Sequence, residues 1–210
     1  MKRLAILGAS GHGKVVAEIA ELSAWSEIVF FDDAFPEVSS IGVWPVQGNT
    51  VALLNSLSEF DGCIVAIGNN EIRLEKTLTI QSSHDCLVSL VHPSSIISKY
   101  AEIGTGSVVM AGAVINSFAK LGIACIVNTA VSIDHDCEIG NGVHLSPGAN
   151  LAGAVKVGQK TWLGIGASVK QCVSIGDNVI VGAGAAVVSD ILNDVVVVGV
   201  PAKVKNKLDV

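Results

Sequence analysis

The second half of the chain carries an aliphatic residue at every sixth position. From Val91 to Val187, 17 successive sixth positions are Val, Ile or Leu without exception. The fifth residue of each repeat, two positions before the next aliphatic one, is small or β-branched in nearly every case, as at Ala113, Cys125 and Val155. A fixed short period is typical of a solenoid whose units pack only on their neighbours. A large residue beside a small one, with Gly or Asn at the turns, predicts a parallel β-helix of triangular cross-section.

Three such repeats make one coil of about 18 residues, so the pattern predicts slightly fewer than six coils with strands ~4.8 Å apart. No insertion interrupts the repeats, and we expect no long loop to project from the solenoid. An open solenoid leaves flat faces that commonly pack against copies of themselves, which favours a cyclic oligomer.

The first 90 residues follow a different pattern, in which short apolar strands alternate with segments of helical spacing. Strands are expected at residues 2–7, 27–31, 63–67 and 87–90, and helices at 14–22, 48–57 and 70–81. This alternation predicts a small parallel α/β sheet. We therefore expect two domains, residues 1–88 and 89–210, with a last strand at 195–198 and GVPAK closing the coil.

Composition fits this picture and narrows the function. The chain is 50% hydrophobic but only 4% aromatic, so its core must be aliphatic. Its net charge of −6, without a Lys/Arg cluster, argues against nucleic acid or an anionic membrane as partner. No stretch is long and apolar enough to span a bilayer. The opening MKRLAIL runs into GASGHG rather than into the apolar core of a signal peptide.

The five cysteines form no CxxC pair. Cys125 and Cys137 fall at the small interior position of their repeats, so they are expected to be buried hydrophobic residues rather than disulfide partners or ligands. This usage indicates a reducing compartment, and we expect a cytoplasmic protein.

His135 is the first candidate for chemistry, because Asp134 and Asp136 flank it at a turn position. An imidazole beside carboxylates can act as a general base with a fixed tautomer. A solvated surface histidine is the alternative.

Positions 18 residues apart should stack, which relates other polar residues to His135. Gly153 should lie directly above His135, where its amide could stabilise an oxyanion or simply form a turn. His144 lies half a coil from His135, so both would serve one reaction only across an interface between adjacent subunits. Asn128 should lie one coil below the His144 region.

The N-terminal GASGHGK segment forms a strand-to-helix turn whose amides suit a phosphate. Its glycine spacing departs from G-x-G-x-x-G, which argues against an NAD-dependent enzyme. Polar strand ends at Asp32, Asp33, Gly68 and Asn69 should converge on the same sheet edge and predict a nucleotide site. Solvated strand ends are the alternative. His12, inside the turn, could touch the ligand.

The whole chain resembles the sugar O/N-acetyltransferases of the NeuD/PglD type, which belong to the left-handed β-helix acyltransferases. The resemblance rests on these segments: GASGHGKVV (8–16), FFDD (30–33), AIGNNEIR (66–73), LVHPSSIIS (90–98), NTAVSIDHDCEIG (128–140), HLSPGANLAG (144–153) and VGVPAK (198–203). It implies a Rossmann-like nucleotide-sugar-binding domain, then a left-handed parallel β-helix that binds acetyl-CoA and carries out catalysis.

The resemblance also implies a homotrimer with acetyl-CoA in the groove between adjacent solenoids, and no metal. In it, His135 is the general base, Asp136 supports it and Asn128 lines the same site. The residues implied for acetyl-CoA binding are His144, Gly153, Ile165, Ala183 and Lys203. Those implied for the nucleotide-sugar are Gly11, His12, Gly13, Asp32, Asp33, Gly68 and Asn69.

The AIGNNEIR segment is most similar to members that acetylate a UDP-4-amino-4,6-dideoxy-N-acetylglucosamine to UDP-N,N′-diacetylbacillosamine. Related members act on GDP-perosamine or sialic acid. The expected reaction is direct attack of the sugar amine on the thioester, with His135 taking the proton and no enzyme nucleophile.

Other classes of function stay open. A metal hydrolase on this fold would need three clustered His ligands. Of the five histidines, His12 and His84 belong to the first domain, and His92 lies more than two coils below His135. A nucleotide-sugar-sensing module would bind ligand without releasing thiol from acetyl-CoA. A purely structural solenoid would leave the DHD motif without a role.

Overall fold

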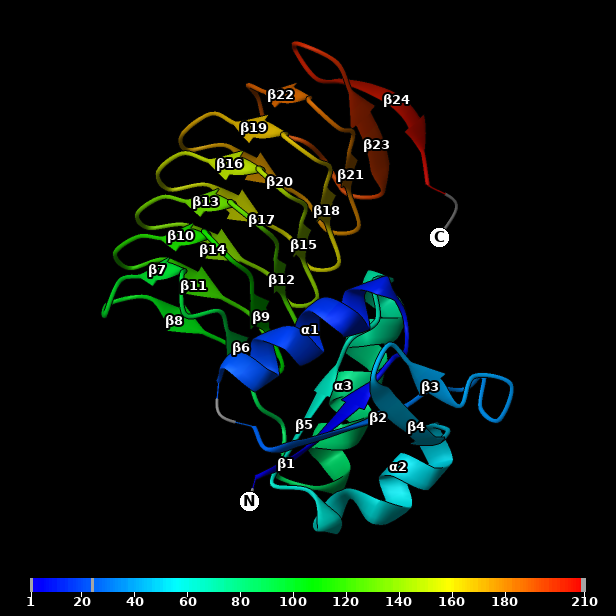
Figure 1. The fold of residues 1–210 in the computed structure, drawn as a ribbon. Helices are drawn as coiled ribbons and strands as arrows, with labels where there is room; N and C mark the ends of the chain where they lie inside the picture. Colours follow the sequence, from blue (N-terminus) through cyan, green and yellow to red (C-terminus); the bar gives the residue numbers. More distant parts are fainter. Residues whose placement is uncertain (1, 24, 209–210) are drawn as a thin grey trace. The chain divides into compact units, whose positions relative to one another are not determined.

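The computed structural model describes residues 2–23 and 25–208, which form two compact units, Met1–Pro93 and Ser94–Val210 (Figure 1). The sequence pattern predicts this division slightly earlier in the chain. Each unit has its own core, and the two are described separately.

The first unit is a five-stranded sheet in the order β3-β4-β2-β1-β5. Its strands are β1 (Arg3–Leu7), β2 (Glu27–Phe31), β3 (Ser40–Ile41), β4 (Trp44–Gly48) and β5 (Gly62–Val65). Its helices are α1 (Gly11–Leu22), α2 (Thr50–Ser56), the 3-10 turn η1 (Leu57–Glu59) and α3 (Asn70–Ser83). All pairings are parallel except β3 with β4. This arrangement places the carboxyl ends of β1, β2 and β5 side by side.

Three local predictions in and after this unit were wrong or incomplete. A helix was expected from residue 48, but β4 occupies Trp44–Gly48 and the helix begins at Thr50, because the Asn49 side chain accepts the Ala52 N–H at 3.0 Å. The short hairpin β3–β4 was missed. The strand expected at 87–90 is only a bridge from Leu87 to Cys63, followed by β6 (Leu90–Val91).

The second unit is a triangular β-helix with three faces, and strands 18 residues apart stack in parallel (Figure 1). We name each face after one strand of a single coil: β15 (His144–Leu145), β16 (Asn150–Leu151) and β17 (Lys156–Val157). The 17 strands from β6 to β22 each end on one of the 17 aliphatic positions, which confirms the repeat prediction.

The strands of each face have the following bounds. The β15 face contains β6, β9 (Val108–Val109), β12 (Ile126–Val127), β15, β18 (Trp162–Leu163), β21 (Ile180–Val181), β23 (Val195–Val198) and β24 (Lys203–Lys207). The β16 face contains β7 (Ile96–Ile97), β10 (Val114–Ile115), β13 (Ser132–Ile133), β16, β19 (Ser168–Val169) and β22 (Ala186–Val187). The β17 face contains β8 (Glu102–Ile103), β11 (Lys120–Leu121), β14 (Glu138–Ile139), β17 and β20 (Ser174–Ile175).

The solenoid ends in a pairing that the pattern did not predict. The predicted strand at 195–198 is β23, but β24 then folds back antiparallel to it. All five residues of β24 are exposed, so no apolar alternation marks it in the sequence.

The turns share one backbone feature. From residue 106 to residue 184, every sixth residue has a positive φ, whether it is glycine, as at Gly148, or another type, as at Ala130 and Asp136. The left-handed conformation is unfavourable for most side chains, so it persists only where the surrounding structure enforces it. Here the stacked coils fix the conformation of each turn.

The interior of the solenoid should determine its stability. Leu145 in β15 is fully buried, so truncation in Leu145→Ala leaves a cavity and should lower the free energy of unfolding by ~2–5 kcal/mol. Leu192→Ala is the matched control, because this side chain is 83% exposed and should change stability by less than about 0.5 kcal/mol. Urea denaturation followed by circular dichroism measures both, and equal effects would contradict the assigned interior.

Candidate active site

His135 lies in the tight turn between β13 and β14, where its side chain is 60% exposed. The next residue, Asp136, adopts φ 58°, and its Oδ2 lies 2.8 Å from His135 Nδ1. A carboxylate can only accept, so Nδ1 carries the proton in this contact. The neutral imidazole then has its lone pair on Nε2, the arrangement that a general base needs.

Two carboxylates hold the pKa of His135 above its usual value. The largest cause is the hydrogen bond to Asp136, followed by the charge of Asp134. Asp134 Oδ1 accepts the His135 N–H at 2.8 Å and the Asn116 Nδ2–H at 2.9 Å, and these bonds lower the pKa of that carboxyl. Asp134 therefore stays ionised beside the imidazole and fixes the backbone of the turn.

Gly153 lies against the ring of His135, one coil above it. The N–H of the next residue, Ala154, donates to the His135 carbonyl at 2.8 Å, which joins the two turns. A Cβ at position 153 would lie 2.6 Å from both Cε1 and Nε2 of the imidazole. Only glycine leaves the ring in its place, so this stacked pair, expected from the 18-residue spacing, is present.

A groove of about 340 Å³ runs along the β15 face and the turns that follow its strands. Asn128 Nδ2 lies 3.4 Å from His144 Nε2. The His144 ring stacks on Trp162 with centroids 5.8 Å apart and an interplanar angle of 8°. Trp162 Nε1 donates to Ser146 Oγ at 2.7 Å, which fixes the indole. We call this the Trp162 groove.

The Trp162 groove brings together four of the expected residues, Asn128, His144, Ile165 and Ala183. Ile165 is 62% exposed, so the groove presents apolar surface to solvent. Its complete lining is Asn128, His144, Ser146, Pro147, Trp162, Gly164, Ile165, Ile180, Val181, Gly182 and Ala183. Lys203 is not part of the lining. It is exposed on β24, where it pairs with Val198.

One solenoid does not place His135 in the Trp162 groove. The groove follows the edge between the β15 and β16 faces, and His135 lies on the next edge, between the β16 and β17 faces. The expected residues therefore form two groups on one subunit. Asn128 belongs with His144, and Gly153 with His135.

The first unit has a pocket of about 280 Å³ at the carboxyl ends of β1, β2 and β5. It is lined by Leu7, Gly8, Ser10, Asp32, Asp33, Ile67, Gly68 and Ile72. Asp32 Oδ2 accepts the Ala9 N–H at 2.7 Å, and Asp33 Oδ1 accepts the Thr50 N–H at 2.8 Å. These bonds order the loops around the pocket and leave further lone pairs for a ligand.

The other expected residues of this unit have different surroundings. Asn69 caps α3 by accepting the Ile72 N–H, and a Cβ on Gly13 would meet the Gly8 carbonyl at 2.3 Å. Gly11 has open space around its Cα. These three residues shape the turns, and none of them lines the pocket.

His12 has an unusual environment in the first turn of α1. Its Nε2 is buried without a hydrogen-bond partner, and burial together with the Arg73 charge lowers its pKa to about 4. Arg73 is itself buried, where Nη1 donates to the carbonyls of Ile67 and Gly68. His12 is therefore neutral at pH 7.

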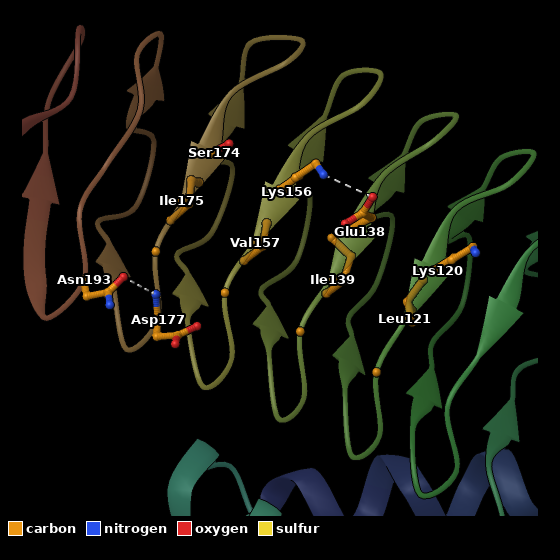
Figure 2. Close-up of a pocket in the computed structure, with 14 residues that line it drawn as sticks. Lys120, Leu121, Glu138, Ile139, Lys156, Val157, Ser174, Ile175, Asp177 and Asn193 are labelled. Atoms are coloured by element: carbon orange, nitrogen blue, oxygen red, sulfur yellow. Dashed lines mark hydrogen bonds and ion pairs between the residues drawn. The ribbon is translucent and has the colours of Figure 1, made fainter.

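A wider concavity of about 800 Å³ lies on the β17 face, away from every expected site residue. Figure 2 shows its row of Lys120, Glu138 and Lys156, in which Lys156 Nζ lies 3.2 Å from Glu138 Oε1. Cross-strand pairs of opposite charge are typical of a solvated sheet surface. The volume of a concavity therefore does not indicate which part of this solenoid is the candidate active site.

Several residues that shape the sites were not predicted from the sequence. Trp162 was not singled out, although it lies 18 residues beyond His144 and the coil period places it there. Ser146, which fixes the indole, follows from the same period. Arg73 gave no signal, because a single arginine in a helical pattern normally indicates an exposed side chain.

The described residues were also compared with the patterns of metal sites and of membrane-spanning helices. Within residues 2–23 and 25–208, no three His, Cys, Asp or Glu side chains are grouped to hold a metal ion. No helix in those same ranges has the length and apolar character needed to cross a bilayer.

Comparison with known proteins was made by family and by structure. Residues 3–78 match the PglD N-terminal domain, and residues 154–188 match the bacterial transferase hexapeptide repeat. The acetyltransferase domain of PglB from Neisseria gonorrhoeae FA1090, solved with acetyl coenzyme A, is 45% identical with a TM-score of 0.93, over 97% of this chain and 98% of that one. PerB from Caulobacter crescentus, solved with CoA and GDP-perosamine, is 36% identical with a TM-score of 0.93, over 98% of each chain.

A curated relative, the UDP-N-acetylbacillosamine N-acetyltransferase of Bacillus subtilis (strain 168), is 39% identical over 113 residues. That match spans 53% of this chain and about half, 52%, of the relative's length. The chain belongs to the family of PglB/PerB-type sugar N-acetyltransferases, which are acyltransferases with a left-handed β-helix of hexapeptide repeats.

The carboxylate contact predicts a measurable change in the titration of His135. Asp136→Asn removes the carboxylate whose hydrogen bond contributes most to the raised pKa, so the pKa of His135 should fall toward its usual value. Imidazole proton shifts in NMR titrations, assigned with His135→Gln, measure it. Asp177→Asn is the matched control, because Asp177 is a turn carboxylate that accepts the Gln159 N–H. An unchanged pKa in Asp136→Asn would contradict the contact.

Proposed function

We propose that this protein transfers the acetyl group of acetyl-CoA to the 4-amino group of a UDP-4-amino-4,6-dideoxy-N-acetylglucosamine, giving UDP-N,N′-diacetylbacillosamine. The observation that carries the proposal is the His135–Asp136 pair, an exposed imidazole whose Nδ1 is fixed at 2.8 Å from a carboxylate. The name of the Bacillus subtilis relative supports the choice of acceptor.

The proposed reaction needs two proton transfers, one from the sugar amine to His135 and one from His135 to the CoA thiolate. The sugar amine attacks the thioester carbonyl, and His135 Nε2 takes the amine proton as the C–N bond forms. The C–S bond then breaks, and the imidazolium returns the proton to the CoA thiolate. The Gly153 N–H is the proposed donor to the oxyanion, while Asp134 and Asp136 stabilise the imidazolium. No covalent enzyme intermediate is required.

Acetyl-CoA is the proposed ligand of the Trp162 groove. The exposed Ile165 and the half-exposed Trp162 offer apolar surface for the pantetheine arm, and Asn128 and His144 provide polar groups at its lower end. Lys203 is proposed to contact the same cofactor from β24. The acetyl-CoA complex of the similar PglB domain supports this assignment.

A homotrimer would complete the site. His135 and the Trp162 groove lie on different edges of one solenoid, so we place His135 of one subunit against the groove of its neighbour. Cyclic symmetry then creates three equivalent sites.

The N-terminal pocket is the proposed nucleotide site. Its helix N-terminus and backbone amides suit a diphosphate, and Asp32 and Asp33 lie where an acidic residue meets a ribose in related sheets. Gly11, His12, Gly13, Gly68 and Asn69 complete this proposed region.

GDP-perosamine N-acetylation is the second candidate reaction, because PerB is similar over nearly the whole chain and was solved with that sugar nucleotide. The same catalytic groups would serve it. Sialic acid O-acetylation and nucleotide-sugar binding without catalysis are further outcomes that one assay separates.

The direct test is thiol release from acetyl-CoA with the UDP-4-amino sugar, GDP-perosamine or sialic acid as acceptor. Turnover on the UDP-4-amino sugar is the expected result, and His135→Ala should lower kcat by ~10²–10⁴-fold because the general base is lost. Turnover only on another acceptor would overturn the proposed substrate. Binding without thiol release from any acceptor would favour a non-catalytic binding module. Nearly full kcat in His135→Ala would contradict the assignment of His135 as the general base.

Mixing two inactive variants tests the composite site. His135→Ala retains the groove, and Ile165→Asp retains His135 but puts a charge on an exposed groove position. If each site combines two subunits, co-expressed trimers should regain about one quarter of wild-type activity, since a random neighbour pair has the productive order with that frequency. The separately expressed variants are the controls, and no recovery in verified mixed trimers would place the whole site within one subunit.

A further inference from the structure

Phe118 is an outlier among the turn residues of the solenoid. Its φ is 63°, and its side chain is 57% exposed. The other residues at this turn position from 106 to 184 are Gly, Ala, Asp, Lys, Cys or Asn. A bulky aromatic side chain with positive φ is rare and unfavourable, so an outlier of this kind is a reason to look for function.

Phe118 has an aromatic partner one coil below. The ring of Tyr100 stacks on it with centroids 5.3 Å apart and an interplanar angle of 20°. Tyr100 is 53% exposed, and Lys99 Nζ lies 4.8 Å from the centre of its ring. The two rings therefore form an exposed apolar surface with a cation at one end, which we call the Tyr100–Phe118 platform.

The platform lies on the same edge as His135, directly below it. The Asp136 N–H donates to the carbonyl of Ser117 at 3.1 Å, which joins the His135 turn to the Phe118 turn. The strands on both sides keep the 18-residue register, since β10 pairs with β13 and β11 with β14. Tyr100, with Lys99 next to it in the same turn, then Phe118 and then the His135 turn thus follow one another along the edge at steps of ~4.8 Å.

We propose that the Tyr100–Phe118 platform binds the hexose ring of the acceptor, with the amine toward His135. This proposal rests on the proposed function and adds the residues that position the sugar.

Charge and polarity support this occupant. A sugar nucleotide carries its negative charge at one end and the reacting amine at the other, with a hexose between them. The edge presents an apolar surface next to a base, and Lys99 lies beside the ring that is farther from His135. A 6-deoxy sugar has a methyl group in place of the hydroxymethyl group, and the C–H groups of such a ring gain by covering exposed aromatic carbon.

The test is Phe118→Ala, which the backbone should accept because Ala124, Ala130 and Ala154 hold the same conformation in other coils. We expect KM for the amino sugar to rise roughly 3- to 10-fold, from the loss of one aromatic contact. KM for acetyl-CoA and the inhibition constant of UDP, which lacks the hexose, should not change. Phe118→Tyr should restore the wild-type KM. Leu192→Ala is the control for removal of an exposed apolar side chain.

Binding of the sugar nucleotide and of UDP, measured by calorimetry, separates this proposal from the reaction itself. If the wild type releases no thiol but Phe118→Ala still weakens only the sugar nucleotide, the platform stands and the proposed reaction fails. Unchanged sugar-nucleotide affinity in Phe118→Ala would overturn the platform. Dissociation of the oligomer in Phe118→Ala would also overturn it, because the rings would then be a subunit contact.

Discussion

The 18-residue register of the coils is the constraint on which this molecule depends. Each strand contributes only two residues, and backbone hydrogen bonds to the coils above and below hold it, as from Val114 N–H to the Val131 carbonyl at 2.8 Å. A slip of one residue would expose the aliphatic ladder on every face. The register therefore fixes the interior, the conformation of the turns and the column of turn residues along each edge.

One of these columns also contains the proposed catalytic pair, His135 and Asp136. The left-handed turn position brings Asp136 against Nδ1 of its own neighbour His135, so the pair needs no second element to support it. The coil above must then be glycine at position 153, because any Cβ there would meet the ring. One geometric rule thus sets the tautomer of the imidazole, its orientation and the space over its face.

Periodicity made much of this predictable from the sequence, and its limits follow from the same physics. Adding 18 placed Gly153 over His135, and the same addition would have found Trp162 beside His144. The first unit has no such period. Its strand β4 was not predicted because Pro45 and Gly48 are unfavourable in strands, and only the neighbouring strands stabilise it. The hydrogen bonds that commit Asp32 and Asp33 to loop amides, and the burial of Arg73, depend on tertiary contacts that no local pattern encodes.

The pKa values of His135 and His12 are shifted in opposite directions because the surroundings of the two side chains differ. His135 is exposed between carboxylates, which favour its charged form, so it can accept a proton during the reaction and be stabilised as the imidazolium. Burial and the Arg73 charge instead lower the pKa of His12 to about 4, so this imidazole is neutral at pH 7. His135 lies on one edge of the solenoid and the Trp162 groove on another, so the two do not meet within a single solenoid. The proposed direct transfer at His135 would therefore require assembly, for which the flat, repeated faces of the coil offer contact surfaces.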